Sequence, residues 1–138
     1  MSLRCLIAED DRISRTFLSE FLSDYGHCDA TSDGMEALDA ILDAIKKKEP
    51  YDLLCLDIMM PKVDGLRVLK VLRKVEAQQK IPPEKRLRVI IMTAIADMEY
   101  VDEAFRLGCD AYASKPIDTD QVLETRSEEH TSELQSRL

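Results

Sequence analysis

Five side chains of complementary charge come directly after hydrophobic segments of the chain. They are the carboxylates of Glu9, Asp10 and Asp57, the hydroxyl of Thr93 and the ammonium group of Lys115. Three carboxylates that lie close together repel one another and therefore call for a cation. An oxygen-rich site of this kind suits Mg²⁺, which together with Lys115 would balance the three negative charges. A phosphoryl group arriving on Asp57 would then find charge partners in place.

The hydrophobic pattern predicts how these residues are positioned. Short apolar runs alternate with segments whose apolar residues recur at helical spacing. The predicted strands cover residues 4–8, 27–31, 53–56, 88–92 and 111–114. The predicted helices carry apolar stripes over residues 13–22, 35–45, 66–75 and 101–105, and a fifth starts near Asp118. This alternation predicts an α/β fold with a doubly wound parallel sheet, in which ligands bind beyond the carboxyl ends of the strands.

Each of the five residues also has an ordinary structural interpretation. An aspartate that ends a strand is usually a cap or turn residue, and an acidic pair that opens a helix interacts favourably with the helix dipole. Thr93 could cap a helix, and a lysine before proline is usually a solvated loop residue. These interpretations do not explain why all five groups fall at the same end of the predicted sheet, which favours a functional site.

Composition and charge exclude several classes of function. The length of 138 residues fits one compact domain. A formal net charge of -8 argues against direct binding of nucleic acid, because phosphate backbones need a basic face. The apolar runs are too short to span a bilayer and no secretory signal is visible, so we expect a cytoplasmic protein without membrane contact.

The cysteines form no C-x-x-C pair, which favours buried free thiols over redox or metal roles. They are Cys5, Cys28, Cys55 and Cys109.

Four segments of the chain resemble the signature segments of response-regulator receiver domains. They are Glu9-Asp10, the run LCLDIMMPKVDG around Asp57, MTA at residues 92–94 and AYASKP at residues 111–116. Their order and spacing also agree with that family. The resemblance implies a receiver domain over residues 1–125, with a flavodoxin-like doubly wound sheet of five parallel strands in the order 2-1-3-4-5 and five flanking helices.

The resemblance also implies a role for each site residue. Asp57 would take a phosphoryl group from a histidine kinase or a phosphotransfer protein, assisted by Thr93 and Lys115. Thr93 would then shift, and the aromatic ring of Tyr112 would move inward. This change would alter the surface of the fourth helix, fifth strand and fifth helix, and thereby control a target protein or an output domain. The chain would catalyse only its own phosphotransfer and dephosphorylation, and would not otherwise be an enzyme.

The magnesium ligands follow from the same resemblance. Asp10 matches a direct ligand of Mg²⁺, and Glu9 matches an acidic neighbour that often acts through metal-bound water. The family usually has aspartate at the position of Glu9, and glutamate is a familiar variant. Asp57 would also bind the ion, and Met59 would offer its backbone carbonyl.

Three other functions compete with this interpretation. A haloacid-dehalogenase-like phosphatase also uses a strand-end aspartate with Mg²⁺, but needs an acid where this chain has Met59. A nucleotide-binding module would need a glycine-rich phosphate loop, which the sequence lacks. A pseudo-receiver of the same fold, which never takes phosphate, is opposed by the intact set of five polar residues.

Several local features carry separate expectations. Met59 and Ile95 are apolar and cannot hydrogen-bond an attacking water, which predicts slow self-dephosphorylation. Pro116 suggests a cis peptide bond after Lys115, and Gly65 fits a turn that needs a positive φ. The long connection over residues 80–86 is interpreted as a solvated basic loop in preference to a dedicated docking site.

Residues 126–136 read RSEEHTSELQS, which matches the in-frame translation of a widely used sequencing-adapter oligonucleotide. We therefore interpret residues 126–138 as an artefact that replaced the natural C-terminus, with a genuine polar helical tail as the alternative. On this interpretation an output domain could have followed in the natural gene.

Overall fold

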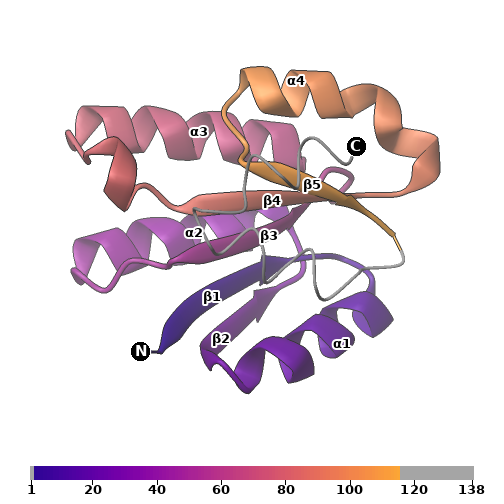
Figure 1. The fold of residues 1–138 in the computed structure, drawn as a ribbon, viewed down its shortest axis with the longest axis horizontal. Coiled ribbons are helices and arrows are strands. Elements are labelled where there is room, and N and C mark those ends of the chain that lie inside the picture. The colour runs from indigo at the N-terminus through magenta and orange to yellow at the C-terminus, as the bar shows by residue number, and fades with distance from the viewer. Residues whose placement is uncertain (1, 116–138) are drawn as a thin grey trace.

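The computed structural model describes residues 2–115, whose centre is a parallel sheet of five strands (Figure 1). The strands lie in the order β2-β1-β3-β4-β5, which confirms the expected topology. β3 is buried along its whole length, as expected for a central strand covered on both faces. The strands are β1 (Leu3–Ala8), β2 (Gly26–Thr31), β3 (Leu53–Asp57), β4 (Arg88–Thr93) and β5 (Ala111–Ser114).

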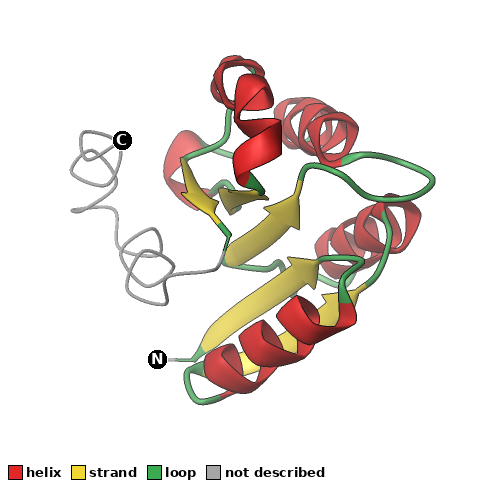
Figure 2. Cartoon of the chain, turned by 90° about the vertical axis from the view of Figure 1, so that its right-hand side faces the viewer, coloured by secondary structure: helices red, strands yellow, loops and turns green. Residues whose placement is uncertain are grey.

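Helices cover both faces of this sheet (Figure 2). Within residues 2–115 the α-helices are α1 (Arg12–Ser23), α2 (Gly34–Lys46), α3 (Gly65–Gln78) and α4 (Val101–Arg106). Two short 3₁₀ helices, η1 (Pro83–Lys85) and η2 (Ile95–Tyr100), precede β4 and α4. The predicted fifth helix, the predicted cis bond before Pro116 and the adapter-like segment 126–138 lie outside the described residues.

The core consists of two layers because successive side chains of a strand point to opposite faces. On one face Cys5 and Ile7 of β1 pack with Leu18 and Leu22 of α1. On the other face Leu6 and Ala8 belong to a cluster with residues of α2, α3 and α4, including Ile41, Leu69 and Ala104. Each strand end is thereby held between layers, which fixes the residues that follow it.

An aspartate caps the N-terminus of three helices. The side chains of Asp11, Asp33 and Asp64 accept hydrogen bonds at 2.9 Å from backbone amides in the first turns of α1, α2 and α3. Such caps satisfy amides that have no partner within the helix. Because Asp11 caps α1, Glu9 and Asp10 stay available for other contacts.

The prediction of a positive φ at Gly65 is wrong. The described glycines with positive φ are Gly26 and Gly108, whereas Gly65 is the first residue of α3. Glycine is required at this position for another reason, because a Cβ atom there would lie 2.2 Å from the carbonyl oxygen of Asp57. The amide of Gly65 also donates to the Ile58 carbonyl at 2.8 Å. The start of α3 thus packs directly against the end of β3.

All four cysteines are free thiols, as predicted, and three of them are buried. Burial raises the pKa of Cys28 to about 11 and that of Cys109 to about 12, so both stay protonated at neutral pH. Within residues 2–115, no helix has the length and apolar character needed to cross a membrane.

Candidate functional site

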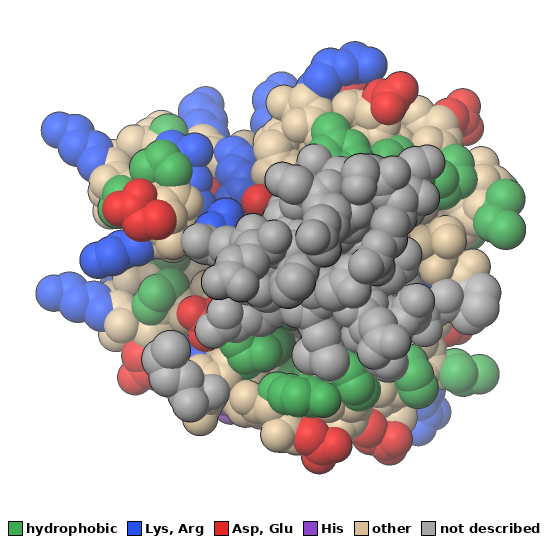
Figure 3. All heavy atoms as spheres, viewed as in Figure 1, with side chains coloured by type: hydrophobic (Ala, Val, Ile, Leu, Met, Phe, Trp, Pro, Cys, Tyr) green, Lys and Arg blue, Asp and Glu red, His purple; other side chains and the backbone are tan. Residues whose placement is uncertain are grey.

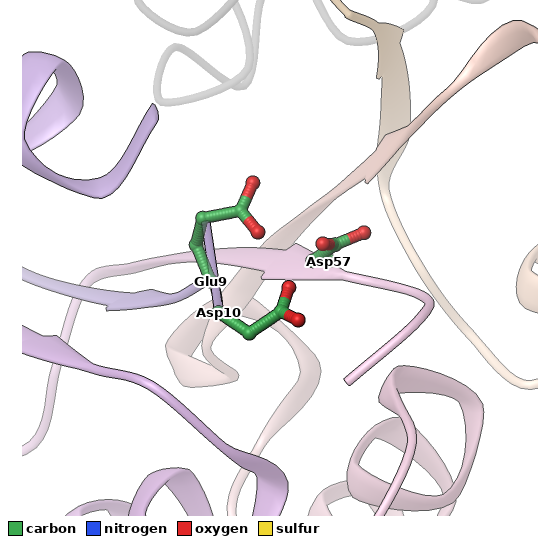
Figure 4. A group of neighbouring side chains, drawn as sticks. All are labelled: Glu9, Asp10 and Asp57. Atoms are coloured by element: carbon green, nitrogen blue, oxygen red, sulfur yellow. The ribbon is translucent and has the colours of Figure 1, made fainter. Parts of the chain in front are cut away.

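The three acidic side chains predicted to converge do so at the carboxyl ends of β1 and β3 (Figure 4). Each of Glu9, Asp10 and Asp57 offers a carboxylate oxygen, and these oxygens lie within 4.8 Å of one another. Glu9 is fully buried and Asp57 is 5% exposed, whereas Asp10 faces solvent. Adjacent strands β1 and β3 pair in register through Ala8 and Leu56, which places the residues that follow side by side.

Lys115 joins this cluster from the end of β5. Its Nζ lies 2.5 Å from Glu9 Oε1 and 3.1 Å from Asp57 Oδ2. Its backbone amide donates to the Thr93 carbonyl at 2.8 Å, which fixes the start of the side chain. Burial alone would lower the pKa of Lys115, but the two carboxylates outweigh burial and raise it. The lysine is therefore held as a cation between two acids.

Burial and the close approach of the carboxylates raise the pKa values of two of the acids, Glu9 and Asp10. Burial, and secondarily the neighbouring Asp57, raises the pKa of Glu9 despite its contact with Lys115. Burial and the adjacent Glu9 also raise the pKa of Asp10. Glu9 Oε1 lies against the lysine ammonium but accepts no hydrogen bond of regular geometry from the described residues. Three carboxylates with one ammonium leave an excess of negative charge that one divalent cation would neutralise. The residues therefore fit Mg²⁺, which prefers such oxygen ligands.

Backbone contacts hold the acidic loop in place. Arg15 of α1 donates from its guanidinium to the carbonyls of Glu9 and Asp10, at 2.9 and 3.3 Å. The amide of Asp11 donates to Glu9 Oε2 at 3.1 Å. Arg15 was not predicted as a site residue. A basic residue five positions after Asp10 was the available signal, but its contacts with backbone carbonyls could not be inferred from spacing.

Asp57 lies at the end of the central strand. It pairs with Met92 of β4, and the next amide, that of Ile58, donates to the Met92 carbonyl at 3.3 Å. The Met59 amide approaches Asp57 Oδ1 at 3.4 Å, while its side chain is 46% exposed. The expected role of the Met59 carbonyl toward Mg²⁺ stays a prediction.

Thr93 ends β4, and Tyr112 lies on the neighbouring strand β5. Thr93 is fully buried and its hydroxyl donates to the Ala94 carbonyl at 3.0 Å. The half-buried Tyr112 ring meets Phe105 of α4 edge to face, with ring centroids 6.2 Å apart. Tyr112 thus connects β5 to α4, but the movement of both residues on phosphorylation stays a prediction.

The raised pKa values of Glu9 and Asp10 predict that protons compete with Mg²⁺ as the pH falls. Metal ligands must be deprotonated, so affinity should drop when the pH approaches these raised values from above. We expect Mg²⁺ affinity, measured by isothermal titration calorimetry, to fall more than about threefold between about pH 7.5 and about pH 5.5. Glu9→Gln should weaken binding at the higher pH and flatten this dependence.

Asp39→Asn provides the matched control, because Asp39 is an exposed residue of α2 far along the chain from the cluster. It removes the same charge and should leave both affinities unchanged. Equal Mg²⁺ affinity of the unsubstituted protein at the two pH values would contradict the prediction.

Comparisons with known proteins agree with this geometry. A family model described as the response regulator receiver domain matches residues 5–126. Sporulation initiation phosphotransferase F of Bacillus subtilis (strain 168) is 30% identical over 123 residues, covering 88% of this chain and 89% of that protein. The receiver domain of the histidine kinase CKI1 from Arabidopsis thaliana, solved in complex with Mg²⁺, is 25% identical with a TM-score of 0.73, covering 85% of this chain and 86% of that one.

Other relatives are longer than this chain. The probable transcriptional regulator ycf29 of Porphyra purpurea is 32% identical over 124 residues, which are 89% of this chain but 54% of that protein. The chain thus spans about half the length of this relative, and a smaller share of related histidine kinases.

Proposed function

This chain belongs to the response regulator receiver domain family, and we propose that it accepts a phosphoryl group on Asp57 from the phosphohistidine of a histidine kinase or phosphotransfer protein. The observation that carries the proposal is the position of the Asp57 carboxylate. It ends the central strand within 4.8 Å of two further carboxylates and 3.1 Å from the Lys115 ammonium. An isolated strand-end cap would have no such surroundings.

The proposed transfer needs positioning more than covalent chemistry. A carboxylate oxygen of Asp57 forms a bond to phosphorus while the bond from phosphorus to the imidazole nitrogen of the donor breaks, and the electron pair returns to the imidazole. Lys115, already beside Asp57, stabilises the negative charge of the transferred oxygens. Mg²⁺, when bound by Glu9, Asp10 and Asp57, supplies further positive charge at the same place. The Thr93 hydroxyl would then turn from the Ala94 carbonyl toward the new oxygens.

The consequence is a change in a surface some distance from Asp57. The oxygens of the phosphoryl group on Asp57 would attract the Lys115 ammonium and the Thr93 hydroxyl, which lie at the ends of neighbouring strands. Tyr112 connects β5 with α4 through Phe105, so a shift of Thr93 can reach α4. We infer that the surface of α4, β5 and the predicted fifth helix controls a partner protein or an attached output domain.

A protein donor fits the surroundings of the cluster. Ile13 at the start of α1 is 81% exposed, and Ile95 after β4 is 78% exposed. Exposed apolar side chains beside a polar site are typical of a surface that binds another protein. We also infer a cytoplasmic location, because four free thiols suit a reducing compartment. The chain modifies only itself and otherwise has no enzymatic activity in this proposal.

Intact-mass measurement with acetyl phosphate tests the proposed function. In the presence of Mg²⁺ the protein should gain the mass of one phosphoryl group, and chelation of Mg²⁺ with EDTA should prevent the gain. A pseudo-receiver would show no gain under either condition. A phosphatase would release inorganic phosphate continuously, but the chain has the exposed apolar Met59 where that reaction needs an acid.

The phosphorylated protein should lose its phosphoryl group slowly. Met59 and Ile95 are 46% and 78% exposed next to the site, and neither side chain can orient a water toward the acyl phosphate. Introducing polar groups by Met59→Asn with Ile95→Glu should accelerate decay by about tenfold or more. Phosphate release after removal of acetyl phosphate measures the rate, and a double variant that decays no faster than the parent would refute the explanation.

A further inference from the structure

A basic groove lies at the opposite end of the sheet from Asp57. Two open cavities of about 360 and 350 Å³ adjoin there, and Arg86 and Arg88 line both. The first cavity lies beside Tyr51, which precedes β3, and the second beside Gly108, which precedes β5. Figure 3 shows Lys and Arg side chains gathered along the left-hand side of the molecule, where Figure 1 places the segment before β4.

Among the residues that line this groove, basic side chains outnumber acidic ones, although the chain as a whole carries a formal net charge of -8. Arg73 and Arg106 also pair with Glu76 and Glu103, which line neither cavity. Its acidic lining residues are Asp52, Glu84 and Asp110. Its basic lining residues are Arg73, Lys85, Arg86, Arg88 and Arg106.

Buried and half-buried charged side chains anchor the segment that carries these basic residues. Arg73 of α3 donates to the Leu87 carbonyl at 2.8 Å, and the 2% exposed Glu76 accepts from the Leu87 amide at 2.8 Å. Asp110 accepts from the Val89 amide at 2.8 Å. These hydrogen bonds fix the backbone next to Arg86 and Arg88. The adjoining loop over residues 80–86 was predicted from sequence to be a solvated connection, with a docking site as the alternative.

The groove is separate from the phosphorylation site. Arg88 begins β4 and Thr93 ends it, so about five residue steps of about 3.3 Å, or about 16 Å, divide the two. A partner seated in the groove would leave Asp57 accessible.

We propose that the basic groove is a docking site for an acidic peptide segment of a protein partner. Guanidinium groups bind carboxylates through paired, charge-assisted hydrogen bonds. The anchored backbone lowers the entropy lost when a ligand orders these side chains. Arg86 is exposed, and so is Arg106, whose guanidinium contacts Glu103 at 3.3 Å. A carboxylate of the ligand would displace Glu103 from Arg106.

The shape and charge of the groove favour a peptide over other anions. Two adjoining cavities extend beyond the size of a single small anion, and Pro50, Pro83 and Leu107 provide apolar walls beside the charged groups. A nucleic acid would extend past the groove onto a predominantly acidic chain, which would repel its phosphates. A short acidic segment needs only the groove itself.

Titration of the ¹⁵N-labelled full chain with a hexaglutamate peptide, followed by NMR, tests the proposal. Amide shifts should concentrate at residues 83–88 and 106–110. The double variant Arg86→Glu with Arg106→Glu should weaken binding by at least about tenfold. The double variant Lys70→Glu with Lys74→Glu changes the same charge on exposed positions of α3 that line neither cavity, and should bind as the parent does.

Labelling by acetyl phosphate should be unchanged in both double variants, which separates this proposal from the proposed function. Equal weakening in the lysine variant, or no shifts up to about 5 mM peptide, would overturn the docking site. Inorganic phosphate that produced the same shifts at equal affinity would show a small-anion site instead. Tighter binding of a single-stranded oligonucleotide would likewise overturn the peptide assignment.

Discussion

Asp57→Asn should abolish phosphorylation of this protein by acetyl phosphate. The amide has nearly the shape of the carboxylate but lacks the charge that makes the oxygen a nucleophile. We expect no gain of phosphoryl mass in the variant under conditions that label the parent completely. Because the substitution removes one of three mutually repelling carboxylates, the variant should stay folded, which circular dichroism can verify.

Asp102→Asn is the matched control for this variant. Asp102 is an exposed residue of α4 and the substitution makes the same change of charge. It should be labelled as the parent is. Full labelling of Asp57→Asn would mean that another residue is the acceptor, and the proposed function would lose its central assignment.

Arg73→Ala should cause a large loss of stability although Arg73 lies away from the phosphorylation site. The Arg73 guanidinium contacts Glu76 Oε1 at 2.7 Å and Asp110 Oδ2 at 3.2 Å, and donates to the carbonyls of Leu87 and Gly108. Its removal leaves the carboxylate of Glu76, which is 2% exposed, without its cation. Breaking a buried pair from one side costs about 3–5 kcal/mol. Urea unfolding measures this difference in the free energy of unfolding.

Two further substitutions define the cause of that loss. Arg73→Lys keeps the charge but not the forked donor geometry, so it should restore only part of the stability. Lys47→Ala removes an exposed lysine paired with Asp43 at 3.0 Å, and should cost about 1 kcal/mol or less. If Arg73→Ala cost no more than Lys47→Ala, the network would not be what anchors the segment before β4.

Local patterns predicted the elements of this fold well, with differences where packing intervenes. Apolar runs predicted all five strands and the first four helices, and the α/β alternation predicted the parallel sheet. The 3₁₀ helix η2, which precedes α4, was not predicted. Gly65 was predicted to lie in a turn with a positive φ, whereas the close approach of the Asp57 carbonyl is what requires glycine there. That approach depends on how α3 packs on β3 and has no signature in the local sequence.

The sequence by itself determined which chemical groups this protein has at the ends of its strands. Alternation and helical spacing are properties of neighbouring residues, and the rule that parallel strands share one carboxyl edge then brings Glu9, Asp57 and Lys115 together. Only the tertiary structure decided that Lys115 contacts both Glu9 and Asp57, that Arg15 holds the acidic loop, and that a buried network supports a basic groove. Such contacts depend on how rotamers and helices pack across the sheet, and separations along the chain do not encode that packing.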